Sequence, residues 1–431
     1  MFGYYLDLAW RSLRRNKVLT ILMVLAIGLG IGASMTMITV LHVMSGDPVP
    51  GLSSKLYVPM LDPRSGTPDP DDVPDGFTWP DAINLIRARR ADAQAAMAKG
   101  VTVVHPPQDG LGAFFSGGQF ATSEYFSMFD VPFRAGHGWS ARQDQAHARV
   151  LVLNGELAHK LFGDARAVGR TVRLNDTDFR VIGVLDDWNP QPAFYRQKGI
   201  HLYGSADQIF LPLQTALELH MPMDGHFSCW GNGDESRMSD HCTWVQLWVR
   251  LGNPARALAY RHYLEHYWRD QQSHGRFPRK QSPPRLYGLM DWLAHEHVIP
   301  DTLSMQMWLA IGFLVVCMLS VVALLLAKFL RRSGEIGVRR ALGASRGAVF
   351  AQCLVEAGMV GLVGGIGGWL LTLTGLWLVR RQPVEYADLA HQDLGMFGVT
   401  FVLAIVASLL AGLLPALRAS RVAPALQLKT L

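Results

Sequence analysis

Two cysteines and three histidines in one polar stretch are the side chains best suited to bind a metal or form a covalent bond. Cys229 and Cys242 are separated by 12 residues, and His220, His226 and His241 lie near them. In an oxidising compartment the cysteines would pair, and the closed loop would contribute about 3 kcal/mol in the chain-entropy model. A metal site is the second interpretation, although the closely spaced ligand pairs typical of zinc sites are missing. Two free thiols are the third, and spacing alone leaves all three open.

The other residue of chemical interest is Glu356, the single charge in an apolar run from Gly347 to Val379. A carboxylate inside a membrane span is costly and usually faces protein or water, so a proton relay is one hypothesis. A relay needs partners, and none of the other long apolar runs contains an Asp or a Glu. We therefore expect Glu356 to pack or to hydrogen-bond between helices.

Residue sets typical of enzyme active sites do not stand out. The sequence has no Ser/His/Asp set or carboxylate pair with a suggestive spacing, and no G-x-x-x-x-G-K-[ST] phosphate-binding loop. Cys317 and Cys353 fall in apolar runs and are predicted to be packing residues. We expect no catalytic residue, no metal ligand and no cofactor-binding residue in this chain, and no nucleic acid among its partners.

Four long apolar runs must position these residues. Hydrophobic residues make up 49% of the 431 residues and charged residues only 17%, below the roughly 25% of soluble proteins. The first run, Val18 to Leu41, would be about 36 Å long as a helix, enough for the hydrocarbon core of a bilayer. A cleavable signal peptide is the rival interpretation of this run, but it is too long and lacks an obvious cleavage site. The sequence predicts an α-helical membrane protein with four transmembrane helices and a large mixed α/β extracytoplasmic domain between helices 1 and 2.

The predicted boundaries follow from the apolar runs. An amphipathic N-terminal helix occupies residues 1–17, the transmembrane helices occupy 18–45, 303–327, 350–379 and 395–417, the outer domain occupies 46–302, and the short segments are 328–349, 380–394 and 418–431. Leu6, Trp10 and Leu13 share one face of the N-terminal helix, which suits a helix lying on lipid at the inner membrane surface. A simple cluster of topogenic charges is the alternative.

Basic residues predict the orientation of the spans. They flank the first span and dominate the segment after the second span and the C-terminal tail: Arg11, Arg14, Arg15, Lys17, Lys328, Arg331, Arg332, Arg339, Arg340, Arg346, Arg418, Arg421 and Lys429. In residues 380–394, two arginines are offset by three acids. Because basic segments stay inside, both termini are expected in the cytoplasm and residues 46–302 on the outer side of the membrane.

The outer region shows both helix and strand patterns. Residues 59–80 form a Pro-, Asp- and Gly-rich surface segment, and the expected helices cover residues 79–98, 155–162 and 254–271. The expected strands cover residues 101–104, 149–153, 170–174, 178–185 and 243–250. We expect residues 114–213 to be an inserted subdomain, because a helix–strand pattern precedes them and a strand–helix pattern follows them.

Several segments resemble the MacB/FtsX family of ABC permeases. In the membrane part these are residues 332–345, RSGEIGVRRALGAS, residues 356–365, EAGMVGLVGG, and residues 414–426, LPALRASRVAPAL. In the outer part they are residues 123–126, SEYF, residues 150–164, VLVLNGELAHKLFGD, residues 168–172, VGRTV, and residues 179–184, FRVIGV. The resemblance covers the whole chain in order, and it implies a location in the inner membrane of a bacterial cell.

The resemblance implies a mechanism. Such permeases dimerise, here with an identical or a paralogous permease, and bind two cytoplasmic ATPase subunits that hold ATP and Mg²⁺. Because this sequence has no phosphate-binding loop, we expect the ATPase to be another polypeptide. The cytoplasmic loop would contact it through Glu335, Ile336, Gly337, Arg339, Arg340, Leu342, Gly343 and Ser345. Glu335 and Arg339 can pair one turn apart, while Ile336 and Leu342 can insert into a groove of the partner. A loop that contacts only lipid headgroups is the alternative.

Three function classes follow from the resemblance. The first is export of an amphiphilic substrate such as a peptide, an antibiotic or lipid-linked cargo, with a periplasmic adaptor and an outer-membrane channel as candidate partners. The second is lipoprotein release. The third is mechanotransmission without transport, in which ATP turnover regulates a periplasmic partner. An outer domain of this size with the MacB-like block favours the first class over the third.

Overall fold

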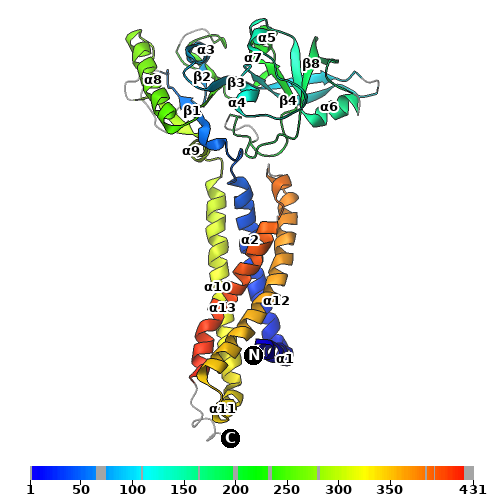
Figure 1. Ribbon diagram of the computed structural model, residues 1–431, viewed down its shortest axis with the longest axis vertical. Helices are drawn as coiled ribbons and strands as arrows, with labels where there is room; N and C mark the ends of the chain where they lie inside the picture. The colour runs from blue at the N-terminus through cyan, green and yellow to red at the C-terminus, as the bar shows by residue number, and fades with distance from the viewer. Residues whose placement is uncertain are drawn as a thin grey trace. The chain divides into compact units, whose positions relative to one another are not determined.

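The chain divides into two compact units (Figure 1). A computed structural model describes residues 2–64, 74–107, 110–163, 166–197, 202–231, 235–278, 282–383, 386–392 and 394–421. The membrane unit comprises Met1–Ser45 and Ile299–Leu431, and the outer unit comprises Gly46–Val298. The outer unit therefore interrupts the sequence of the membrane unit after its first long helix.

Four helices of the membrane unit are long and apolar enough to cross a membrane, as the sequence predicts. They are α2 (Lys17–Met44), α10 (Asp301–Arg331), α12 (Arg346–Arg380) and α13 (Leu394–Ser420), and the shorter helices are α1 (Phe2–Arg15), α11 (Ser333–Ala341) and η2 (Ala387–Leu389). The helices extend past the predicted apolar runs. Helix α10 ends at Arg331, one turn beyond Ala327, so it includes Lys328. This extension matters for the site described below.

Glycines allow α12 to contact two neighbouring helices closely. A Cβ added at Gly364 would lie 2.7 Å from Cγ2 of Ile27 on α2. On another side of α12, a Cβ added at Gly365 would lie 2.9 Å from Cβ of Ala404 on α13. Helices in a membrane associate largely through such close packing of small residues.

The outer unit is built on one 13-stranded sheet within the described residues. Its main order is β13-β1-β12-β3-β4-β9-β6-β8-β5, while β2, β7, β10 and β11 pair at the sides. The strands are β1 (Leu56–Met60), β2 (Phe77–Thr78), β3 (Ala93–His105), β4 (Phe114–Ala121), β5 (Phe133–Gly136), β6 (Val150–Leu153), β7 (Thr171–Leu174), β8 (Thr177–Leu185), β9 (Ile209–Pro212), β10 (Met223–Asp224), β11 (Ser228–Cys229), β12 (Cys242–Arg250) and β13 (Arg285–Gly288).

Helices cover this sheet and join its strands. They are η1 (Ser53–Lys55), α3 (Trp79–Ala88), α4 (Tyr125–Met128), α5 (Ala141–Gln145), α6 (Gly155–Phe162), α7 (Leu213–Glu218), α8 (Pro254–Ser273) and α9 (Leu289–His295). Helix α6 matches its predicted range, and β6, β7, β8, β12 and α8 lie within two residues of theirs. Residues 65–73 of the predicted surface segment lie outside the described residues, and Pro59 of that segment belongs to β1.

The predicted helix over residues 79–98 is wrong beyond Ala88, because β3 begins at Ala93. Successive β3 side chains enter two different cores. Ala96 and Ala98 belong to the cluster around Phe120 and Trp244, whereas Ala95 and Met97 belong to the cluster around Trp248. This alternation is a strand periodicity. Alanine favours a helix locally, but the small side chains let β3 pack on both faces of the sheet.

The inserted subdomain over residues 114–213 stays a prediction. Strands β3 and β12, which flank it in sequence, pair antiparallel with Ala96 opposite Leu247. The first and last strands of the segment, β4 and β9, pair in parallel, and β4 also pairs with β3. Residues 114–213 therefore share one continuous sheet with the flanking strands.

Asp207 is a buried charge that holds this sheet together. Its carboxylate is ion-paired with the ammonium of Lys99 and lies 3.2 Å from Nε of Arg196. Burial alone would raise the pKa of Asp207, but the two cations outweigh burial and lower it. Burial lowers the pKa of Lys99. The three groups join β3 to the segment before β9, so the ion pairs tie distant parts of the chain together.

Asp144 in α5 is a buried carboxyl that forms no ion pair within 4 Å among the described residues. Its Oδ2 accepts a hydrogen bond from the backbone N–H of Ser123 at 3.0 Å, and its Oδ1 has no partner among the described residues. Burial raises the pKa of Asp144 to about 6, against the opposing effects of the Ser123 hydrogen bond and of His147.

This pKa predicts how the stability of the outer unit depends on pH. Residues 46–298 expressed alone should fold, and the contribution of Asp144 to their free energy of unfolding should fall as pH rises from about 4 to about 6, because its folded-state carboxyl retains a proton that the unfolded chain has lost. Asp144→Asn keeps the acceptor for Ser123, so it should be more stable than the parent by about 2–3 kcal/mol at pH 7 and similar at about pH 4.

Urea unfolding followed by circular dichroism across this pH range measures the difference. Asp176→Asn is the matched control, since the side chain of Asp176 is fully exposed. Parallel pH profiles for the Asp144 variant and the parent would contradict the assignment.

Candidate functional site

Glu356 lies at a buried ion pair between two spans. It sits on α12 and is 2% exposed, while Lys328, on the last turns of α10, is 1% exposed. The ammonium Nζ of Lys328 lies 2.6 Å from Oε1 of Glu356. A charge buried in a helix bundle requires such a partner, because an unpaired one would be strongly destabilising. The carboxylate of Glu356 on α12 thus contacts a cation on a second helix, α10.

Two further groups complete the surroundings of this carboxylate. The hydroxyl of Ser12, on α1, donates a short hydrogen bond to Oε1 of Glu356. The guanidinium of Arg332 donates to the same hydroxyl at 2.6 Å, and its Nη1 lies 3.5 Å from Oε2 of Glu356. Helices α1, α10 and α12 therefore meet at one carboxylate.

The contacts continue into α11. Nη2 of Arg332 lies 3.4 Å from Oε2 of Glu335, and Oε1 of Glu335 lies 2.9 Å from Nη2 of Arg339. Arg339 also donates to Oε1 of Gln352 on α12 at 3.2 Å. We call the set Ser12, Lys328, Arg332, Glu335, Arg339, Gln352 and Glu356 the ion cluster. Through it, the short helix α11 is connected to the spans on both sides of it.

The residues predicted to contact an ATPase do not all face outward. Leu342, which follows α11, is 83% exposed, whereas Ile336 packs against the core of the membrane unit. Of that pair, only Leu342 is available to a partner, and Val338, at 43% exposed, lies one turn before it. Of the remaining predicted residues, Gly337 is buried, Arg340 donates to the carbonyl of Ser420, Gly343 is exposed, and Ser345 caps α12 by accepting from the N–H of Ala348.

Gly343 ends α11 for a backbone reason. Its φ is +101°, a conformation that residues with a Cβ rarely adopt. The glycine after a helix lets the chain turn, and α12 begins three residues later at Arg346. The turn leaves Leu342 at the exposed end of α11.

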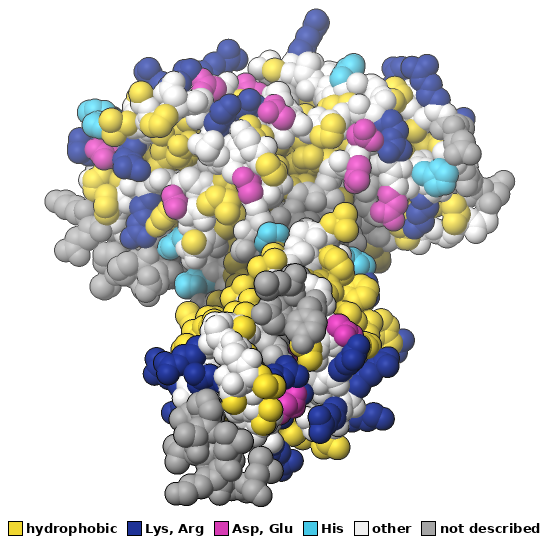
Figure 2. Space-filling model, turned by 60° about the horizontal axis from the view of Figure 1, so that its bottom comes forward, with side chains coloured by type: hydrophobic (Ala, Val, Ile, Leu, Met, Phe, Trp, Pro, Cys, Tyr) yellow, Lys and Arg dark blue, Asp and Glu magenta, His cyan; other side chains and the backbone are white. Residues whose placement is uncertain are grey.

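Basic side chains surround this end of the membrane unit (Figure 2). The exposed ones among the described residues are Arg11, Arg14, Arg15, Lys17, Arg331, Arg346, Arg418 and Arg421. On α1, the face turned toward the protein consists of Ala9, Ser12 and Leu13, while Trp10 is 45% exposed. The predicted apolar face is therefore divided, since Leu13 packs inside and Trp10 faces outward.

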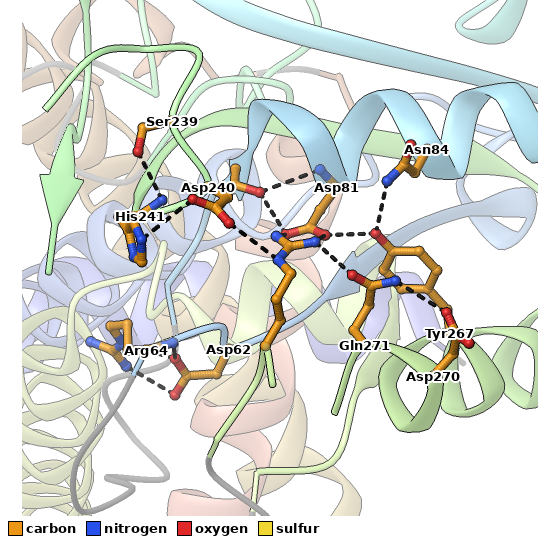
Figure 3. A network of polar contacts seen from close by, with 12 residues as sticks. Asp62, Arg64, Asp81, Asn84, Ser239, Asp240, His241, Tyr267, Asp270 and Gln271 are labelled. Atoms are coloured by element: carbon orange, nitrogen blue, oxygen red, sulfur yellow. Dashed lines mark hydrogen bonds and ion pairs between the residues drawn. The ribbon is translucent and has the colours of Figure 1, made fainter. Parts of the chain in front are cut away.

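The outer unit contains a separate polar network around Asp81 (Figure 3). Asp81 on α3 pairs with the guanidinium of Arg276 through contacts of 2.9 and 2.8 Å, and accepts from the hydroxyl of Tyr267 on α8 at 2.6 Å. Nε of Arg276 also lies 3.5 Å from Oδ2 of Asp240. The network therefore fastens the loop before β12 to helices α3 and α8, which is a structural task.

Cys229 and Cys242 are disulfide-bonded in this structure, across the paired strands β11 and β12. The three nearby histidines are separately engaged. His226 lies 3.4 Å from Asp75, His241 lies 3.4 Å from Asp240, and Nδ1 of His220 lies 3.0 Å from the carbonyl oxygen of Glu218. Within the described residues no three potential metal ligands gather.

Two protein families match successive parts of the chain. Residues 20–267 match the MacB-like periplasmic core domain, and residues 307–424 match the FtsX-like permease C-terminal domain. The chain belongs to the MacB/FtsX family of ABC permeases. In this family the large α/β unit is a periplasmic core domain, and the four apolar helices belong to a permease of the inner membrane.

Curated relatives share this arrangement at low sequence identity. The macrolide export ATP-binding/permease protein MacB of Escherichia coli strain K12 is 26% identical over 435 residues, which cover 98% of this chain and 60% of that protein. The protein of the same name from Salmonella typhi is 25% identical over 429 residues, with the same coverage. The chain thus spans about 60% of the length of the curated relatives it matches.

Two solved structures match part of the chain. The periplasmic region of MacB from Actinobacillus actinomycetemcomitans has a TM-score of 0.37 and 14% identity, and covers 56% of this chain and 92% of that one. The extracellular domain of the noncanonic ABC-type transporter YknZ from Gram-positive bacteria has a TM-score of 0.35 and 13% identity, and covers 54% of this chain and 99% of that one.

The sequence indicates Glu356, Glu335 and Arg339 but not the other four members of the ion cluster. From the sequence, Lys328 and Arg332 are only positive charges flanking a span, and neither Ser12 nor Gln352 stands out. A signal was available, since a lone carboxylate in one span requires a cation from a neighbouring one. Lys328 lies one residue beyond the second apolar run and was the nearest candidate.

The buried pair predicts a coupled effect on stability. Lys328→Met and Glu356→Met should each lower the apparent Tm of the chain in detergent, because each leaves a buried charge without its partner, at a cost of about 3–5 kcal/mol. The double variant should recover at least half of the summed loss. Arg11→Met, which breaks the exposed Asp7–Arg11 pair, is the control and should have little effect. If the Tm of the double variant falls by the sum of the two single-variant losses, the two charges do not interact.

Proposed function

We propose that this chain is the permease part of an ABC exporter, in which a separate ATPase subunit acts on the end of the membrane unit formed by α1 and α11. The observation that carries the proposal is the combination at α11 of an exposed apolar end and a continuous set of ion pairs to the spans. Leu342 and Val338 offer a surface to a partner, and Arg339, Glu335 and Arg332 connect that surface to α10 and α12. A push on α11 therefore reaches two spans through charged contacts.

The basic surface supports a cytoplasmic location for this end. Eight exposed Lys and Arg side chains surround α1 and α11, and such segments are retained in the cytoplasm. With α11 inside, residues 46–298 face the periplasm. An oxidising periplasm also suits the bond between Cys229 and Cys242.

Export of an amphiphilic substrate is the activity that we propose. The curated relatives are named macrolide export proteins, and an outer unit of this size provides a body that ATP-driven movements of the spans would displace. ATP and Mg²⁺ would be held by the ATPase, and a second permease, identical or paralogous, would complete the complex. A periplasmic adaptor and an outer-membrane channel are the further partners of this proposal.

Membrane-impermeant thiol labelling tests the orientation. Met290→Cys in the outer unit should be labelled in spheroplasts, whereas Leu342→Cys should be labelled only after the membrane is opened. Both side chains are exposed, at 44% and 83%, so a difference in labelling reports the side of the membrane. The parent chain gives the background, since Cys317 and Cys353 are buried and the other two cysteines are bonded. Labelling of Leu342→Cys in intact spheroplasts would contradict the proposed cytoplasmic location of α11.

Changing the exposed end of α11 tests the contact with the ATPase. Glu335→Arg combined with Leu342→Asp should weaken co-purification of the cognate ATPase by at least about tenfold. The first substitution reverses a charge, and the second replaces an exposed apolar side chain with a carboxylate. Glu265→Arg with Leu258→Asp is the matched control, since Glu265 also pairs with an arginine one turn away and Leu258 is 56% exposed. Unchanged co-purification of the α11 variant would show that these α11 residues do not contribute to ATPase binding.

A further inference from the structure

Ser12 occupies an unusual position for a serine in a helix. A helical serine commonly turns its hydroxyl to the carbonyl one turn earlier, as Ser34 does with Gly30. The hydroxyl of Ser12 instead donates to Glu356 of α12 and accepts from Arg332 at the end of α10. A hydroxyl has one proton to donate and lone pairs to accept with, so both capacities are directed at charged groups of other helices.

Arg332 is the joint between α10 and α11. Its backbone N–H donates to Phe329 within α10 at 3.1 Å, and its backbone carbonyl accepts from Ile336 within α11 at 3.0 Å. Its guanidinium is shared between Glu356 and Glu335, at 3.5 and 3.4 Å. The contact with the Ser12 hydroxyl, at 2.6 Å, is the shortest of the three. The orientation of this side chain therefore depends on α1.

We propose that Ser12 is a positioning residue, through which α1 holds Arg332 and thereby sets the orientation of α11. The Ser12 hydroxyl keeps the guanidinium between the two carboxylates, so α11 cannot move away from α12 without breaking this contact or carrying α1 with it. Exposed arginines on the other faces of α1 would hold that helix against anionic lipid headgroups. Helix α1 thus restrains the movement of α11 relative to α12.

The first test uses the chain alone in lipid nanodiscs and does not depend on an ATPase. Hydrogen–deuterium exchange of residues 333–341 should be about tenfold faster in Ser12→Ala, because the lost hydrogen bonds involve charged partners. Ser12→Thr keeps a hydroxyl and should restore slow exchange. Ser320→Ala is the matched control, since that exposed hydroxyl bonds only to the carbonyl of Val316. Residues 303–320 should exchange at the parent rate in every variant, which shows that the fold is kept.

Unchanged exchange of residues 333–341 in Ser12→Ala would overturn the proposal. Faster exchange spread equally over α10 would also overturn it, because a local positioning role predicts an effect confined to α11 and its joint.

The second test rests on the proposed function and uses the complex with the cognate ATPase. Ser12→Ala should retain ATPase binding, because it leaves Leu342 and Val338 unchanged, but should reduce the stimulation of ATP hydrolysis by the permease about fivefold or more. Ser12→Thr should restore the stimulation. Normal stimulation in Ser12→Ala would overturn the role of Ser12 in coupling. Failure of the parent chain to bind the ATPase would instead refute the proposed function, while the exchange measurement on the chain alone would stand.

Discussion

Burial of the Glu356 carboxylate is the constraint on which the membrane unit depends. A carboxylate that is only 2% exposed must be paired, and the groups that contact it come from outside its own helix. Lys328 supplies the buried cation from α10, Arg332 adds a second cation at the joint with α11, and Ser12 adds a hydroxyl from α1. The carboxylate therefore specifies how α1, α10 and α12 meet, and the apolar surfaces of the spans do not need to specify it alone.

The same physical rule organises the outer unit by different means. Asp207 is buried in the sheet and pairs with Lys99 and Arg196, while Asp81 is enclosed by Arg276 and two hydroxyl donors. Both networks join segments that are far apart in sequence. The two central carboxylates, Asp81 and Asp207, are both buried.

The polar network of the membrane unit continues to the surface. From Glu356 the contacts pass through Arg332 and Glu335 to Arg339, close to the exposed Leu342. A partially exposed chain of charges is easier to rearrange than a fully buried one, since water can replace a lost partner. This gradient from buried to exposed charge supports the proposal that α11 transmits a movement to the spans.

The sequence alone determined the four spans, the outer unit between the first two, most of the later strands and helices, and the family. Apolar length and local periodicity are properties of neighbouring residues, so they can be read without coordinates. It did not determine the fate of the alanine-rich run at Ala93–Ala98, whose strand conformation depends on two cores formed by distant residues. Nor did it reveal that Ser12, Lys328 and Glu356 meet. Only the tertiary structure decided these, because a small residue or a lone charge takes its role from partners that lie elsewhere in the sequence, such as Glu356 for Ser12.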